Sequence, residues 1–175
     1  MGAGSIANAT FDRLGGILTR ALDGLSIEQI RKQPAGPESN PIGWMAWHLT
    51  RGHDGNFSNL LRRDEAWKSE GWADRFGLSV DIGNASGSTL DEVRAFDPID
   101  APTLLAYWET ARARSREFLD ALREEDLEKI TPPRKGRIDH TYTITVAWTT
   151  TDCAQHIGQI AYARGLVDRH GWYGA

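Results

Sequence analysis

Four long stretches of the chain repeat apolar residues at helical spacing, and this pattern constrains the fold more than any other feature. The stretches cover about residues 7–22, 41–61, 101–122 and 143–165. In each, apolar side chains recur three or four residues apart, which is typical of a helix with one face against a core. The connections are short except for one long crossover at about residues 62–100. We therefore predict an all-α fold, a four-helix bundle formed by a single domain over residues 1–175.

Capping patterns predict where several helices begin. Ser26–Gln29 and Thr89–Glu92 have the spacing of a capping box, so each is expected to open a short helix. Ser39 or Asn40 is expected to cap the second long helix. Pro41 suits its first position, because the missing N–H of proline would be unpaired there in any case.

The fourth stretch gives conflicting signals at its start. Residues 143–151 are rich in β-branched side chains and on local propensity alone would form a strand. We predict a helix, because one helical face then collects the following residues: Val146, Thr149, Cys153, His156, Ile160 and Ala163.

Two further expectations concern the faces of the long helices. Gly15 and Gly16 weaken the first helix by about 1 kcal/mol each relative to alanine, unless a neighbouring helix packs closely there. In the third helix, Arg112 and Arg114 are expected on faces away from the apolar stripe.

Composition argues against some classes of partner. The chain has 20 basic and 24 acidic residues and a net charge of -4, which disfavours nucleic acid. The short basic cluster at residues 134–137 is expected to be a solvated loop. No apolar run approaches about 18 residues and no signal-like pattern opens the chain, so no membrane partner is expected. The single cysteine precludes an intrachain disulfide and fits a cytoplasmic protein. Residues 169–173 are interpreted as a tail that could form an interface.

Asp152 and His156 are the first candidates for a functional site. They lie four residues apart in the fourth helix, so their Cβ atoms are roughly 5–6 Å from each other on one face. Both side chains can reach one metal ion, and helical bundles complete such sites with inward-facing side chains of other helices. His48 of the second helix is the best candidate for a third ligand. Trp44 precedes it by one turn, and Gly52, one turn after it, leaves room for a ligand.

The other histidines are weaker candidates. His53 is about 140° around the helix from His48, so the two cannot face the same ion. His140 lies at the end of a loop and His170 lies in the tail.

The spacing alone leaves a structural interpretation open, because such pairs often arise by chance. A histidine on an apolar helix face would then be a core residue, with Asp152 as its partner in an ion pair of modest strength between positions four residues apart. Cys153 is expected to be a small buried residue, because a nucleophilic cysteine needs a nearby base and an electropositive setting. Thr149 and Gln159 are candidates for groups that support the ligands.

Two segments resemble signatures of the DinB superfamily. Asn-Pro-Ile-Gly-Trp-Met-Ala-Trp-His-Leu at residues 40–49 resembles its second-helix signature, and Asp-Cys-Ala-Gln-His-Ile-Gly-Gln-Ile at residues 152–160 its last-helix signature. The resemblance extends from the first helix to Gly165. It implies a four-helix bundle, often dimeric, in which His48, Asp152 and His156 bind one divalent metal ion, zinc or nickel. A homodimer is therefore a candidate assembly.

The acidic ligand suggests a branch of this superfamily. Many members have histidine where this chain has Asp152, whereas the branch that contains mycothiol-dependent maleylpyruvate isomerase has glutamate. The resemblance then implies a thiol transferase, in which a low-molecular-weight thiol (mycothiol or bacillithiol) binds the metal and attacks an electrophilic small molecule. Trp44 and Arg51 are the candidate cofactor-binding residues. Arg51 either meets an anionic group or is a solvated surface arginine, and Trp67–Phe76 is expected to close over the site.

Other functions remain open at this stage. A metal-bound hydroxide would make the protein a hydrolase, although no general base beyond the ligands is evident. A stress-response protein that binds metal or a small ligand without catalysis would use the same cavity. Two histidines and one carboxylate also form the facial triad of Fe(II) oxygenases, which usually lies on strands of a barrel.

Overall fold

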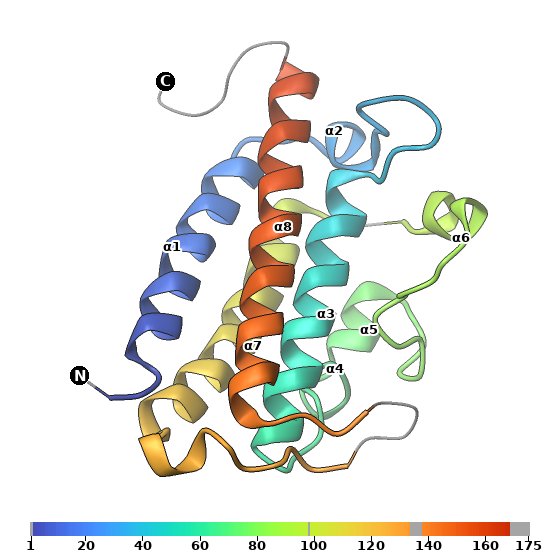
Figure 1. The fold of residues 1–175 in the computed structure, drawn as a ribbon. Coiled ribbons are helices and arrows are strands. Elements are labelled where there is room, and N and C mark those ends of the chain that lie inside the picture. Colours follow the sequence, from blue (N-terminus) through green and yellow to red (C-terminus); the bar gives the residue numbers. More distant parts are fainter. Residues whose placement is uncertain (1, 98, 134–137, 169–175) are drawn as a thin grey trace.

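Four long helices pack side by side in the computed structural model, which describes residues 2–97, 99–133 and 138–168. They are α1 (Ser5–Leu22), α3 (Ile42–Leu60), α7 (Ala101–Ala121) and α8 (Tyr142–Asp168) (Figure 1). The described residues contain no strand beyond one isolated antiparallel bridge between Ile130 and Thr141. The predicted all-α four-helix bundle is therefore confirmed.

Short helices fill the connections. They are α2 (Ile27–Arg31), α4 (Ala66–Ser69), α5 (Trp72–Phe76), α6 (Leu90–Ala95) and a 3-10 turn at Glu124–Asp126. Three of them, α4 to α6, lie in the long crossover between α3 and α7. Both predicted capping boxes are present, at the starts of α2 and α6.

The predicted side-chain cap of α3 was wrong. Pro41 itself occupies the N-cap position, and no side chain caps this helix. The Ser39 hydroxyl instead donates to the Gly36 carbonyl at 2.8 Å and accepts from the Ala35 N–H at 3.1 Å. It stabilises the preceding turn and is not available to the helix.

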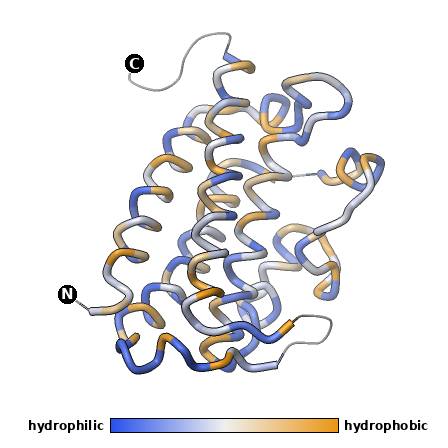
Figure 2. The backbone as a smooth tube through the Cα atoms, in the orientation of Figure 1, coloured by the Kyte–Doolittle hydropathy of each residue, from blue (hydrophilic) through white to orange (hydrophobic). Residues whose placement is uncertain are grey.

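The core lies between α3 and its neighbours α7 and α8, with α1 packed against α7 and α8. Orange apolar segments recur along the long helices in Figure 2, as the sequence periodicity predicts. At Gly15 a Cβ atom would lie 2.9 Å from Trp108 Nε1, so the close approach of α7 requires glycine there. At Gly16 no atom lies within 4 Å of an added Cβ.

The β-branched start of α8 is helical, as predicted. The hydroxyls of Thr149, Thr150 and Thr151 donate to carbonyls four residues earlier, at 2.7, 2.7 and 3.0 Å. These bonds satisfy the threonine side chains within the helix, and packing of α8 against α1 and α3 overrides the strand propensity.

The prediction that Arg112 and Arg114 face away from the core was wrong, because both are buried. Arg112 reaches α1, where its guanidinium lies 2.9 Å from the Asp12 carboxylate. Arg114 reaches the crossover and pairs with Glu70 at 2.7 Å. Acceptors on neighbouring segments satisfy both guanidinium groups, and this makes their burial tolerable.

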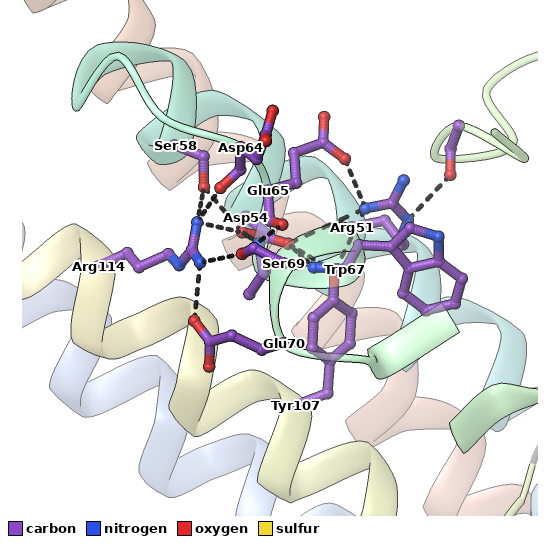
Figure 3. Close-up of polar contacts among 12 residues, drawn as sticks. Arg51, Asp54, Ser58, Asp64, Glu65, Trp67, Ser69, Glu70, Tyr107 and Arg114 are labelled. Atoms are coloured by element: carbon purple, nitrogen blue, oxygen red, sulfur yellow. Dashed lines mark hydrogen bonds and ion pairs between the residues drawn. The ribbon is translucent and has the colours of Figure 1, made fainter. Parts of the chain in front are cut away.

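A fully buried carboxylate joins α3 to the crossover. Asp54 accepts from the backbone N–H groups of Ala66 and Trp67, both at 3.0 Å, and thereby caps the start of α4. It also accepts from the hydroxyls of Ser58 and Tyr107, both at 2.9 Å. Figure 3 shows this carboxylate at the centre of a polar cluster that includes Arg51 and Arg114. This cluster fixes the beginning of the crossover on the side of the bundle.

Two predictions fall outside the described residues: the solvated basic loop at residues 134–137 and the interface tail at residues 169–173. In the part that is described, none of the helices has the length and apolar character needed to cross a membrane.

Candidate metal centre

Helix α3 packs against α8 (Figure 1). These two helices carry His48, Asp152 and His156. His156 Nε2 lies 3.6 Å from Asp152 Oδ1. The His48 and His156 rings meet edge to face, with centroids 4.9 Å apart and an interplanar angle of 82°. The three residues that the sequence selected therefore form one cluster between two helices.

In both His48 and His156, Nδ1 is hydrogen-bonded to an oxygen acceptor. His48 Nδ1 bonds to the backbone carbonyl of Asn84, and His156 Nδ1 bonds to Gln159 Oε1 at 2.9 Å. Because both partners are oxygen acceptors, each Nδ1 carries the proton in the neutral ring and each Nε2 has a free lone pair. This is the tautomer in which Nε2 can bind a metal, with an oxygen acceptor orienting the ring from behind.

The surroundings of His48 favour its neutral form. Burial is the largest effect and lowers the pKa of His48, and the nearby His156 ring lowers it further. The Asn84 carbonyl and the Asp152 carboxylate raise it, but the net shift is downward. A neutral imidazole is the form that coordinates a metal, so His48 does not need to lose a proton at neutral pH.

The Trp44 ring stacks on the His48 ring. The two centroids are 4.7 Å apart, with only 7° between the ring planes. Trp44 is itself buried, so the plane of the His48 ring is fixed by packing as well as by the Asn84 carbonyl. The structure thus places Trp44 beside a candidate ligand, where it orients the ring.

Arg51 is buried in the bundle and does not line the cavity beside His48 and Asp152. Its guanidinium donates to Glu65 at 2.8 Å, to the Tyr107 hydroxyl at 3.3 Å and to the Gly83 carbonyl at 3.0 Å. It is therefore not a solvated surface arginine. These protein acceptors take hydrogen bonds from Nε and Nη1, so both atoms are committed to contacts within the protein.

A cavity of about 540 Å³ opens beside His48 and Asp152. Its other lining residues are polar and uncharged, small or aromatic: Gly52, Asn56, Asn84, Ser86, Trp148, Thr149, Thr151 and Gln155. A Cβ atom at Gly52 would lie 3.8 Å from both Asp152 Oδ2 and Asn84 Nδ2. The absence of a side chain at Gly52 thus keeps space open next to the candidate ligand, as expected from the sequence.

The segment that closes over this site was predicted incorrectly. The Trp67, Trp72 and Phe76 rings pack around Tyr107 in the core, with centroids 5.1 to 5.8 Å from its ring. They are buried there because the Asp54 cluster holds α4 against α3 and α7. The part of the crossover that reaches the site comes later, at residues 83–86, where Asn84 bonds His48 and lines the cavity.

Sequence reasoning missed Asn84. Its backbone carbonyl orients His48, and its side chain accepts from the Ser86 N–H at 3.2 Å. The signal in the sequence was only a run of loop-forming residues, which does not show where the loop lies relative to α3.

His53 and Cys153 do not line this cavity, and Cys153 is buried, as predicted. His53 is fully buried, and its Nδ1 is 3.6 Å from Cys153 Sγ. Burial, together with the neighbouring Asp152 carboxylate, raises the pKa of the Cys153 thiol far above its usual range. Cys153 is therefore an inert core residue. His140 packs its ring on Trp148, and His170 lies outside the described residues.

The donor set fits a divalent ion, although the ligands are not fully converged. Within the described ranges, no three His, Cys, Asp or Glu side chains form a group that could hold a metal as it stands. Ligand atoms about 2.0–2.2 Å from one ion lie about 3–3.5 Å from each other. The 3.6 Å separation of Asp152 and His156 is close to that range. Closer approach of the three side chains to one another would complete a site of two imidazoles and one carboxylate.

Comparisons with known proteins agree with this architecture. The sequence pattern of the DinB superfamily matches residues 10–160. The crystal structure of a conserved protein from Enterococcus faecalis is similar to this chain, with a TM-score of 0.85 and 23% sequence identity. The likeness covers 97% of this chain and 99% of that one, and at this identity it shows the fold alone. No functionally curated protein matches the chain in sequence.

Proposed function

This chain belongs to the DinB superfamily, which includes metal-dependent enzymes, and from this premise we propose that it is a metal-dependent thiol transferase. The thiol is a low-molecular-weight thiol, mycothiol or bacillithiol, and its target is an electrophilic small molecule. The observation that carries the proposal is the cluster of His48, Asp152 and His156, with both Nε2 lone pairs free, next to a cavity of about 540 Å³.

Each residue of the site has a defined part in this proposal. His48, Asp152 and His156 hold one divalent ion, zinc or nickel, while the Asn84 carbonyl and Gln159 keep the two imidazoles in the metal-binding tautomer. The ion would act as a Lewis acid and lower the pKa of a thiol in the cavity, so that the thiol reacts as thiolate. Aspartate, shorter than the glutamate of the related branch, brings the carboxylate within 3.6 Å of His156.

The lining of the cavity favours a transferase over a hydrolase. Hydrolysis benefits from a general base that accepts a proton from water. Apart from the proposed ligands, the lining residues described above carry amides, hydroxyls, an indole or no side chain. None of these groups accepts a proton readily at neutral pH. A thiol is a much stronger acid than water, so at the metal site its proton can pass to solvent without such a base.

Metal analysis tests the site. Protein purified without a nickel column should contain close to one divalent ion per chain, and His48→Ala or His156→Ala should remove it. His140→Ala is the matched control, because His140 packs on Trp148 and does not line this cavity. Retention of the metal by both ligand variants would disprove the proposed site.

Turnover tests the reaction. Incubation with monochlorobimane and a panel of thiols should give conjugate formation that depends on both metal and thiol. Gly52→Ala should keep the fold and the metal, since its nearest new contacts would be at 3.8 Å, but raise the KM for the thiol by filling the cavity. A metal-loaded protein that is inactive with every thiol would be a binding protein. A thiol-independent rate on an ester or amide would indicate a hydrolase.

We also propose a homodimer formed through the outer face of α8. Ile144, Trp148, Tyr162 and Leu166 are exposed along one side of this helix. Between Tyr142 and Ala163 the only carboxylate or basic side chain is Asp152, apart from His156, so two copies of this face can meet with little charge repulsion. Sedimentation should show a dimer that Tyr162→Glu dissociates; a monomeric wild-type protein would contradict this assembly.

A further inference from the structure

A closed path of bonds connects Arg51 to His48 through the crossover. His48 Nδ1 donates to the Asn84 carbonyl, and the preceding residue, Gly83, accepts from Arg51 Nε at 3.0 Å. Arg51 lies three residues after His48 on α3, so both ends of the path start from one rigid helix. Helix α3 therefore holds two successive carbonyl groups of the crossover: Arg51 binds that of Gly83, and His48 binds that of Asn84.

Arg51 can hold the Gly83 carbonyl firmly because its own position is fixed. Its guanidinium pairs with Glu65 at 2.8 Å, bonds the Tyr107 hydroxyl at 3.3 Å and lies 4.5 Å from the centroid of the Trp67 ring. Figure 3 shows Arg51 and Arg114 on opposite sides of Asp54. Only Arg51 extends from this cluster to the segment that contacts His48.

Arg51 does not line the cavity, so it cannot act by touching a ligand there. Its effect must pass through the backbone of residues 83 and 84. The Asn84 carbonyl can orient His48 only while that backbone stays in place, and the Arg51 bond ties the adjacent peptide to α3.

We propose that Arg51 is a positioning residue for His48. By holding the Gly83 carbonyl, it fixes the Asn84 carbonyl, which selects the His48 tautomer with the proton on Nδ1 and leaves Nε2 free for the metal. The inference rests on the proposed function, because this tautomer matters only if His48 binds a metal. The tautomer itself can be measured in metal-free protein.

Three substitutions separate this role from a general effect on stability. Arg51→Lys keeps a positive charge for Glu65 but has carbon where arginine has the Nε donor. Arg51→Gln removes the charge but can place its amide N–H at the position of Nε. Arg114→Lys is the matched control, because Arg114 also approaches Asp54, at 3.8 Å, but its hydrogen bonds go to Ser58, Asp64, Ser69 and Glu70.

The primary readout is the nitrogen NMR spectrum of the His48 ring in metal-free protein at pH 7.5. Wild type, Arg51→Gln and Arg114→Lys should show protonated Nδ1 and unprotonated Nε2, whereas Arg51→Lys should show a mixture of tautomers. Metal affinity is the second readout: Arg51→Lys should weaken it about 10-fold or more, as is common when a group behind a metal ligand is lost. The other two variants should stay within about threefold of wild type.

The inference is overturned if Arg51→Lys keeps the wild-type tautomer, or if Arg114→Lys disturbs it equally. Should Arg51→Lys fail to fold, the double variant Arg51→Met with Glu65→Met replaces the ion pair by apolar side chains, a change that is often tolerated. This double variant also lacks the N–H group that binds the Gly83 carbonyl, so it should give the same mixture of His48 tautomers. If wild type binds no metal, the proposed function fails, and the tautomer comparison still decides the role of Arg51.

Discussion

His48 and His53 lie five residues apart on α3, and their surroundings give them opposite chemistry. His48 has an acceptor at Nδ1 and a cavity beside it, so Nε2 remains usable. His53 is enclosed by Phe11, Phe57 and Trp108, and its buried Nε2 has no hydrogen-bond partner. Helical geometry alone predicted that the two face different directions. It could not predict that His53 Nε2 would lack a hydrogen-bond partner, because this depends on side chains from α1 and α7.

The buried His53 should make the protein sensitive to acid. Burial, with a smaller contribution from Arg112, lowers the pKa of His53 from 6.5 to about 3. Below pH 6.5 the unfolded chain therefore binds a proton that the folded chain does not, and the free energy of unfolding falls by about 1.4 kcal/mol per pH unit until about pH 3. In urea unfolding between pH 7.5 and 4.5, His53→Phe should show a smaller loss with falling pH than wild type. Equal slopes would contradict this origin of the sensitivity.

Among the elements, the long helices were predictable and the crossover was not. Apolar periodicity is local information, so it predicted all four long helices. The spacing of four residues is also local, and it predicted that Asp152 and His156 share one face of the last helix. The position of residues 62–100 depends on contacts between distant residues, such as Asp54 with the N–H groups of α4 and Arg51 with Gly83. Propensity does not encode such contacts. The prediction that Trp67–Phe76 covers the site failed for this reason.

The Asp54 carboxylate should be essential for holding the crossover. It accepts four hydrogen bonds in the core, two of them from the start of α4. Asp54→Asn places a donor amide against these donors and removes the charge between Arg51 and Arg114, at an expected cost of about 3–5 kcal/mol in the free energy of unfolding. Asp81→Asn is the control, because this exposed carboxylate only meets Lys68 at 3.4 Å and should cost at most about 1 kcal/mol. Denaturant unfolding that gives similar values for both would refute the role of Asp54.

For the whole molecule, the position of the candidate ligands would couple metal binding to folding. His48 comes from α3, whereas Asp152 and His156 come from α8, so a shared ion would cross-link two helices that are distant in the sequence. The ligands are brought together only by the packing of the bundle. An ion that binds the folded chain and not the unfolded chain stabilises the bundle by mass action.

Metal should therefore raise the thermal stability of the chain, and this response tests whether Asp152 is a ligand. At a free zinc or nickel concentration of about 100 times Kd, the free energy of unfolding should rise by about 2.7 kcal/mol. For a domain of this size, the midpoint of thermal unfolding should rise by roughly 5–10 °C. Asp152→Ala should lose most of this shift at the same metal concentration, because two imidazoles alone hold a divalent ion weakly. Asp81→Asn should keep the full shift, since this exposed carboxylate pairs with Lys68 and does not line the cavity. If Asp152→Ala responds to metal as wild type does, then Asp152 is not a ligand and the ion is held by the two histidines with another group.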